Sequence, residues 1–133
     1  MLISLVCVLP IVSRMVFLAS YFNTIRAVAG QREPVVLEIV LRNTEEESKL
    51  MSVAIKIPFD LGFDSVGLMR ETRRRLGYVG AGEEKKIPIA LYCKRNIKEG
   101  VYPIEVTAHI HPDKYDKTIA SFPHKTQLRV ISV

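Results

Sequence analysis

The sequence predicts an all-β fold, an antiparallel β-sandwich of seven to eight strands in a single domain over residues 1–133. Short apolar stretches recur at intervals of about ten residues, which is typical of sandwiches. Within most of them apolar and polar residues alternate, as expected for strands whose side chains point alternately to opposite faces. No stretch of useful length shows the helical period of about 3.6 residues. The chain is long enough to bury roughly two thirds of its unfolded surface in one core.

The first 22 residues are strongly apolar, and MLISLVCVLPIVS carries no charge. Its β-branched residues suit a strand buried on both faces, with Pro10 ending the strand or marking an edge. A membrane-spanning helix needs about 20 apolar residues, and Pro10 and Arg14 interrupt this run. A secretory signal has a basic segment before its apolar core, and none precedes Arg14. We therefore expect a strand, with a signal or anchor as the alternative, and a cytoplasmic protein rather than a membrane-anchored or exported one.

The middle and end of the chain contain the clearest strand patterns. The predicted strands with their inward-facing residues are 35–42 (Val35, Leu37, Ile39, Leu41), 49–58 (Met51, Val53, Ile55, Ile57), 87–93 (Ile87, Ile89, Leu91, Cys93), 102–110 (Tyr102, Ile104, Val106, Ala108, Ile110) and a last strand in 125–133. Residues 67–86, GLMRETRRRLGYVGAGEEKK, fit either a short helix through Leu68, Met69, Thr72 and Leu76 or an irregular crossover. Gly77, Gly80 and Gly82 indicate that any such element is brief.

Three of these segments resemble immunoglobulin-like modules of the archaeal and bacterial cell-adhesion-related (CARDB) kind. They are VVLEIVLRNTEEES with its asparagine-containing turn, YVGAGEEKKIPIALYCK with a Gly-Glu turn before a strand, and KEGVYPIEVTAHI with a Gly-x-Tyr strand. The resemblance covers residues 30–111. It implies an immunoglobulin-like sandwich that serves adhesion, spacing or partner binding, and it supplies no catalytic residues.

Composition narrows the class of protein further. Two cysteines, Cys7 and Cys93, form neither a disulfide framework nor a Cys/His cluster, and Cys93 is expected to be a buried thiol. The net charge of +5 mildly favours anionic partners. Few Gln and Asn beside many Lys, Arg and Glu is a bias of heat-adapted proteins, which favours a thermophilic, archaeal source.

The histidines suggest one candidate metal site. His109 and His111 lie on the outward parity of their predicted strand, about 7 Å apart. If residues 112–123 connect neighbouring antiparallel strands, His124 returns near His111 and completes a site of three ligands for zinc or copper. The alternative is that the histidines occupy a solvated face.

The run RETRRR suggests a second candidate site, because it places Arg70, Arg73, Arg74 and Arg75 within six residues. Arginine forks bind phosphate and carboxylate groups alike, so nucleic acid, anionic lipid and an acidic protein are all candidate partners. Nucleic-acid binding usually adds exposed aromatic residues for stacking, and only Tyr78 is near. The alternative is a solvated surface paired with Glu83, Glu84 or the acidic turn 45–47.

Catalytic motifs are missing from the sequence. There is no Gly-x-Ser-x-Gly elbow, and GYVGAGEE fits no phosphate-binding loop. We therefore expect a non-catalytic interaction or structural module without a cofactor; a metal-binding protein and an anion-binding module are the alternatives.

The N-terminal segment predicts a homodimer. Residues 1–13 are apolar at both odd and even positions, so a strand formed by them has an apolar face that the sandwich core does not cover. We expect a second copy of the chain to cover this face. Burial under the 58–80 crossover of the same chain is the competing arrangement.

Overall fold

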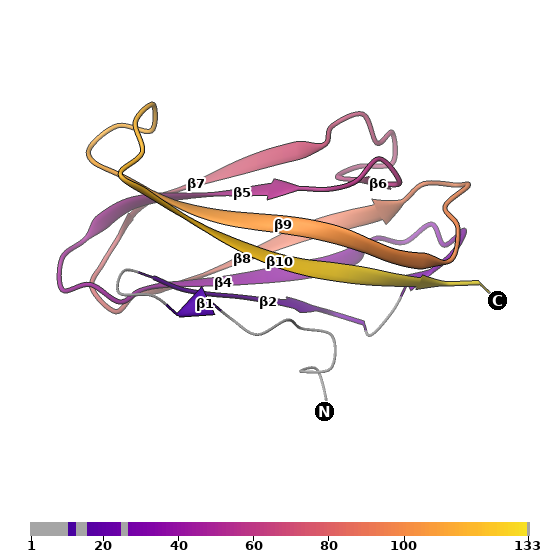
Figure 1. The fold of residues 1–133 in the computed structure, drawn as a ribbon, viewed down its shortest axis with the longest axis horizontal. Coiled ribbons are helices and arrows are strands. Elements are labelled where there is room, and N and C mark those ends of the chain that lie inside the picture. The colour runs from indigo at the N-terminus through magenta and orange to yellow at the C-terminus, as the bar shows by residue number, and fades with distance from the viewer. Residues whose placement is uncertain (1–10, 13–15, 25–26, 133) are drawn as a thin grey trace.

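The computed structural model describes residues 11–12, 16–24 and 27–132, which form two five-stranded sheets packed face to face (Figure 1). The first sheet contains, in spatial order, β1 (Ile11–Val12), β2 (Val16–Phe22), β4 (Val35–Asn43), β8 (Glu84–Cys93) and β6 (Leu61–Gly62). The second contains β3 (Ala27–Val28), β10 (Ala120–Ile131), β9 (Gly100–His111), β5 (Lys49–Lys56) and β7 (Glu71–Val79). Neighbouring strands pair antiparallel, apart from the parallel pair of β3 and β10.

The predicted antiparallel sandwich is confirmed. Ten strands are present among the described residues, and three of them, β1, β3 and β6, have only two residues each. Seven of the strands formed by the described residues have seven residues or more, which agrees with the predicted number, although one of them, β7, lies in a segment that was not predicted to be a strand. The short ones extend the edges of the two sheets.

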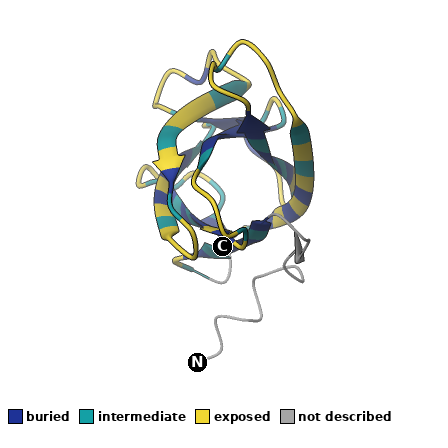
Figure 2. Cartoon of the chain, turned by 90° about the vertical axis from the view of Figure 1, so that its left-hand side faces the viewer, coloured by how far each residue is buried: buried dark blue, intermediate teal, exposed yellow. Residues whose placement is uncertain are grey.

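The core lies between the sheets and includes most of the residues that alternation assigned to the inward faces; Tyr102 and Cys93 are only partly buried. Leu37, Ile39 and Leu41 of β4 are completely buried, and Ile104 and Val106 of β9 face them from the second sheet. Along β8, β9 and β10, buried residues alternate with more exposed ones, whereas β5 is buried on both faces. Figure 2 shows bands of buried and exposed residues in a view from one end of the sandwich. Burial of one face per strand is the principal stabilising contribution to such a fold.

The segment after β6 is a strand, so the expectation of a short helix or irregular crossover was wrong. Residues 71–79 form β7, which pairs antiparallel with β5. The register shifts between Met51 and Ser52 of β5, where Leu76 is the extra residue of a β-bulge. Gly77 follows it with φ of 72°, which a glycine adopts without strain. Because β7 lies at the edge of its sheet and is mostly exposed, its sequence shows little apolar alternation.

Asn43 joins the two turns that belong to the CARDB-like sequence segments. Its side-chain Nδ2 donates to the carbonyl oxygens of Glu47 and Val79, both at 2.8 Å, and its Oδ1 accepts from the backbone N–H of Glu45 at 2.9 Å. Its own backbone N–H donates to Glu83, and its carbonyl accepts from Gly82. The asparagine turn after β4 and the Gly-Glu turn before β8 are therefore one hydrogen-bonded unit.

The N-terminal predictions are covered only in part. Ile11 and Val12 form β1, paired with Leu18 and Phe17 of β2. The rest of the apolar segment, residues 1–10, lies outside the described residues, and with it the alternatives of a signal or an anchor. None of the described residues belongs to a helix that is long and apolar enough to cross a membrane.

Candidate functional site

The edge strand β7 carries the arginine run that the sequence singled out. Within the described residues, β7 pairs along its nine residues on one side only, with β5 (Figure 1). The other three edges end in the two-residue strands β1, β6 and β3, so most of β8 and of β10 also pairs on one side only within this part of the chain. Arg73, Arg74 and Arg75 are all exposed. An edge strand presents unpaired backbone groups to solvent, and β7 presents them next to three positive charges.

The four arginines of the run point in three different directions. Arg73 and Arg75 pair in register with Ala54 and Ser52 and lie on the outer face of the sheet, whereas Arg74 pairs with Val53 and is on the opposite face. Arg70 precedes β7, and its guanidinium lies 4.2 Å from the ring centroid of Phe59. The four side chains therefore do not form one flat basic patch of the kind that tracks a nucleic-acid backbone.

The outer-face arginines have local partners other than those expected. The Arg73 guanidinium is 3.4 Å from the carboxylate of Glu71, and Arg75 lies over the ring of Tyr115 at 4.7 Å. The Tyr115 hydroxyl accepts a hydrogen bond from the backbone N–H of Gly77 at 2.8 Å, so the loop between β9 and β10 covers the bulged end of β7. The open part of the edge is therefore the stretch from Glu71 to Arg75, where the ion pair is exposed and weakly stabilising.

The three histidines do not converge, and the expected three-ligand metal site is not assembled. His109 and His111 share the outer face of β9, with ring centroids 6.2 Å apart. His124 pairs in register with the core residue Val106, so it lies on the opposite face of the same sheet. Among the described residues, no group of three His, Cys, Asp or Glu side chains is arranged to hold a metal ion. Strand β10 does pair antiparallel with β9 after the loop, as predicted, but the register of the pairing turns His124 toward the core.

His111 is buried, not solvated as its outward parity predicted. Its Nε2 lies 2.7 Å from the Ser52 hydroxyl and its Nδ1 lies 2.5 Å from the carbonyl oxygen of Lys117. A carbonyl only accepts, so Nδ1 donates and Nε2 accepts from Ser52. The Tyr115 ring packs against the imidazole edge to face at 5.2 Å. Both ring nitrogens are engaged, and His111 fastens the β9–β10 loop to the sheet.

His109 remains partly exposed beside the arginine edge. Its Nδ1 is 2.8 Å from the Ser121 hydroxyl. Burial lowers the pKa of His109, and the positive charge of Arg73 and the neighbouring His111 lower it further, against a smaller opposite effect of Glu71. The imidazole is therefore neutral near pH 7, and the positive charge of this face comes from the arginines.

A Ser-His pair that the sequence analysis missed lies inside the sandwich. Ser20 of β2 and His124 of β10 face each other across the two sheets, with Oγ and Nε2 3.1 Å apart. Burial lowers the pKa of His124 and keeps the ring neutral. Both side chains are almost completely buried, so a substrate has no access to the hydroxyl, and the pair acts as a structural hydrogen bond. The sequence did contain a sign of this burial, because His124 lies on the same face of its strand as the apolar residues Leu128 and Val130.

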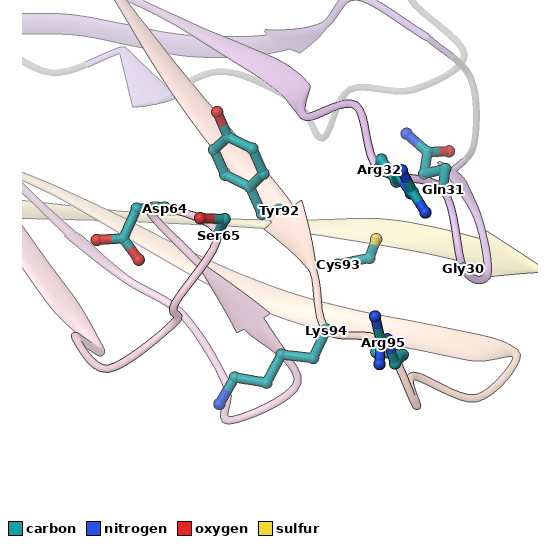
Figure 3. Close-up of a pocket in the computed structure, with 9 residues that line it drawn as sticks. All are labelled: Gly30, Gln31, Arg32, Asp64, Ser65, Tyr92, Cys93, Lys94 and Arg95. Carbon is teal, nitrogen blue, oxygen red and sulfur yellow. The ribbon is translucent and has the colours of Figure 1, made fainter.

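A pocket of about 450 Å³ opens at one end of the sandwich, between the turn after β3, the loop after β6 and the end of β8 (Figure 3). Its basic lining residues are Arg32, Lys94 and Arg95, and its acidic one is Asp64. Cys93, expected to be fully buried, is only partly so because β8 ends at the pocket. Burial nevertheless raises the pKa of its thiol, so it is protonated and unreactive near pH 7.

Comparisons with known proteins agree with the fold. No protein-family model matches the sequence, and no curated protein is detectably similar to it. Among solved structures, the chain is similar to a CARDB domain from Pyrococcus furiosus in complex with di-metal ions, with a TM-score of 0.55 and 15% identity over 92% of this chain and 89% of that one. A FixG-related protein from Vibrio parahaemolyticus matches with a TM-score of 0.55 and 10% identity, over 90% of this chain and 98% of that one.

A segment of a larger protein shares the fold as well. Trypsin-activated alpha-2-macroglobulin from Escherichia coli matches with a TM-score of 0.55 and 15% identity, and the match covers 85% of this chain and 7% of that protein. All of these identities are low, so the likeness concerns the fold. The chain thus has an immunoglobulin-like β-sandwich fold, similar to that of a CARDB domain.

Proposed function

We propose that this protein is a non-catalytic binding module that takes up an extended, acidic segment of a partner protein along β7. The observation that carries the proposal is that β7 pairs along its nine residues with β5 alone among the described residues and bears exposed Arg73, Arg74 and Arg75. An extended peptide can add to such an edge through main-chain hydrogen bonds, and side chains on alternate positions then supply specificity.

The charges select an acidic segment over a second copy of the chain. In a two-fold antiparallel pairing of β7 with itself centred on Arg74, Arg73 of each copy would lie opposite Arg75 of the other. Like charges directly opposite one another are destabilising in a sheet. A strand with glutamate or aspartate on both of its faces places carboxylates opposite arginines on both faces of β7, and arginine binds carboxylates with good geometry.

Charged edges also protect sheets from aggregation, and the experiment has to separate that role from binding. We suggest titrating the protein with a fluorescent peptide of repeating Glu-Glu-Val-Val, which places Glu on both faces of a strand, a Lys-Lys-Val-Val counterpart and an N-methylated form of the acidic peptide, with anisotropy as the readout. The acidic peptide should bind. The basic one should not, and N-methylation should abolish binding because it removes main-chain donors.

Two charge-reversed variants locate the site. Arg73→Glu with Arg74→Glu should remove binding of the acidic peptide. Lys125→Glu with Arg129→Glu makes the same change in net charge on β10, whose residues 120–129 pair with β9 alone in the described part of the chain, and should retain binding. Equal binding by the two variants, or undiminished binding of the N-methylated peptide, would show that β7 does not take up a strand.

A further inference from the structure

The connection from β5 to β7, residues 57–70, concentrates exposed apolar side chains. Phe59 is 63% exposed, Val66 65%, Leu68 80% and Met69 56%. Elsewhere among the described residues, large exposed apolar side chains are isolated: Tyr78, Val101 and Ile119. Single exposed apolar residues are common on soluble proteins, whereas a group of four in one loop indicates an interaction surface. We call this group the apolar loop tip.

The loop that carries the tip has a defined shape. Its ends are joined by the hydrogen bond from the Ile57 N–H to the Arg70 carbonyl at 2.9 Å. Asp64 Oδ1 accepts from the N–H groups of Val66 at 3.0 Å and Gly67 at 2.7 Å. Gly62 and Gly67 touch so closely that a Cβ on Gly62 would lie 2.7 Å from the Gly67 Cα. The exposure of the apolar side chains therefore belongs to a folded loop.

Cationic side chains flank the tip. The Lys94 ammonium lies 3.7 Å from the centroid of the Phe59 ring, and the Arg70 guanidinium lies 4.2 Å from it. Arg32 and Arg95 line the adjoining pocket, opposite the single lining carboxylate of Asp64 (Figure 3). Neither Arg32 nor Arg95 forms an ion pair with another described residue. This end of the sandwich combines exposed hydrocarbon with unneutralised positive charge.

We propose that this end of the sandwich docks on an anionic membrane surface. Leu68, Met69 and Val66 enter the boundary between headgroups and acyl chains. Arg70 and Lys94 bind the lipid phosphates in the headgroup layer above this boundary. The pocket between Arg32 and Arg95 receives a headgroup. The adjacency of apolar and cationic side chains matches the layering of hydrocarbon beneath phosphate in a bilayer. Hot spots for protein partners are enriched in Trp, Tyr and Arg and poor in Leu and Val, whereas the tip itself consists of Phe59, Val66, Leu68 and Met69.

The test is co-sedimentation of the full chain with vesicles of phosphatidylcholine alone and of phosphatidylcholine mixed with phosphatidylglycerol. The parent should sediment with the mixed vesicles and much less with the neutral ones. Leu68→Ser with Met69→Ser should weaken binding about tenfold or more, since two apolar side chains no longer enter the interface. Arg70→Ser with Lys94→Ser should weaken the preference for phosphatidylglycerol without removing it, because Arg32 and Arg95 remain in the pocket.

The matched control is Val101→Ser with Ile119→Ser, which changes two apolar residues of similar exposure, 53% and 58%, outside the loop. This variant should bind as the parent does. All variants keep residues 1–13, so a difference between loop and control variants reports on the loop. A parent that sediments with neither vesicle, or loop variants that sediment as the control does, would overturn the proposal. Because these changes leave Arg73 and Arg74 intact, the result is independent of peptide binding along β7.

Discussion

The Asn43 side chain offers the sharpest test of how this sandwich is stabilised. It is fully buried and makes three hydrogen bonds, to Glu47, Val79 and Glu45, that hold the β4–β5 turn and the β7–β8 turn together. Each such bond contributes about 1 kcal/mol net, and a buried carbonyl left unpaired costs about 1–3 kcal/mol. Asn43→Ala should therefore lower the free energy of unfolding by about 3 kcal/mol. For a domain of this size the Tm should fall by about 10 °C.

A matched control lies at the other end of β4. Asn23 also accepts a backbone hydrogen bond, from Val36 at 2.9 Å, but it is exposed and its side chain makes this one bond among the described residues. Asn23→Ala should cost about 1 kcal/mol or less. Urea unfolding of both variants, followed by circular dichroism because the chain has no tryptophan, measures the difference. Equal losses for the two variants would refute the role given to Asn43.

Asn43→Asp separates hydrogen bonding from volume. The substitution keeps the Oδ1 acceptor but places a carboxylate oxygen where Nδ2 now donates to two carbonyl groups. Near pH 7 the loss should exceed that of Asn43→Ala, because a buried charge then faces two acceptors. Burial raises the pKa of such an aspartate in the folded state, so the loss should shrink on acidification as the carboxyl gains a proton and becomes a donor. A loss that does not change with pH would contradict this explanation.

Three further predictions concern the histidines and the N-terminus. His111→Ala should lower the free energy of unfolding by about 2 kcal/mol, because it removes the hydrogen bonds to Ser52 and to the β9–β10 loop. The zinc content of this variant should equal that of the parent protein. If the parent binds zinc and the variant does not, the metal hypothesis is restored. Burial lowers the pKa of His109 and His124, so the unfolded chain binds more protons below about pH 6.5 and stability should decline from there to the folded pKa values. Urea titrations from about pH 8 to about pH 5 measure this decline, which His124→Leu should reduce; a rise on acidification would contradict the assignment. The homodimer stays a prediction: light scattering should give a dimer for the full chain and a monomer or insoluble protein for a chain starting at Val16, and a monomeric full chain would exclude it.

The sequence by itself determined the fold class and most of the core. In β9, Ile104, Val106, Ala108 and Ile110 are buried as their parity predicted. Alternation is reliable here because each side chain of a strand points to one face or the other, and a shift by one residue would expose the whole apolar set. The CARDB-like segments also placed the two turns that Asn43 connects.

Only the tertiary structure decided what the polar residues do. The parity of His111 was predicted correctly, but its burial depends on Tyr115 and the loop that folds over it. His124 meets Ser20 from a distance of 104 residues along the chain, a pairing that local pattern does not encode. The arginine run forms an edge strand because its backbone pairs with β5. Periodicity records which face of a strand is apolar, whereas the neighbours of a polar side chain are set by sheet order and register, which long-range pairing determines.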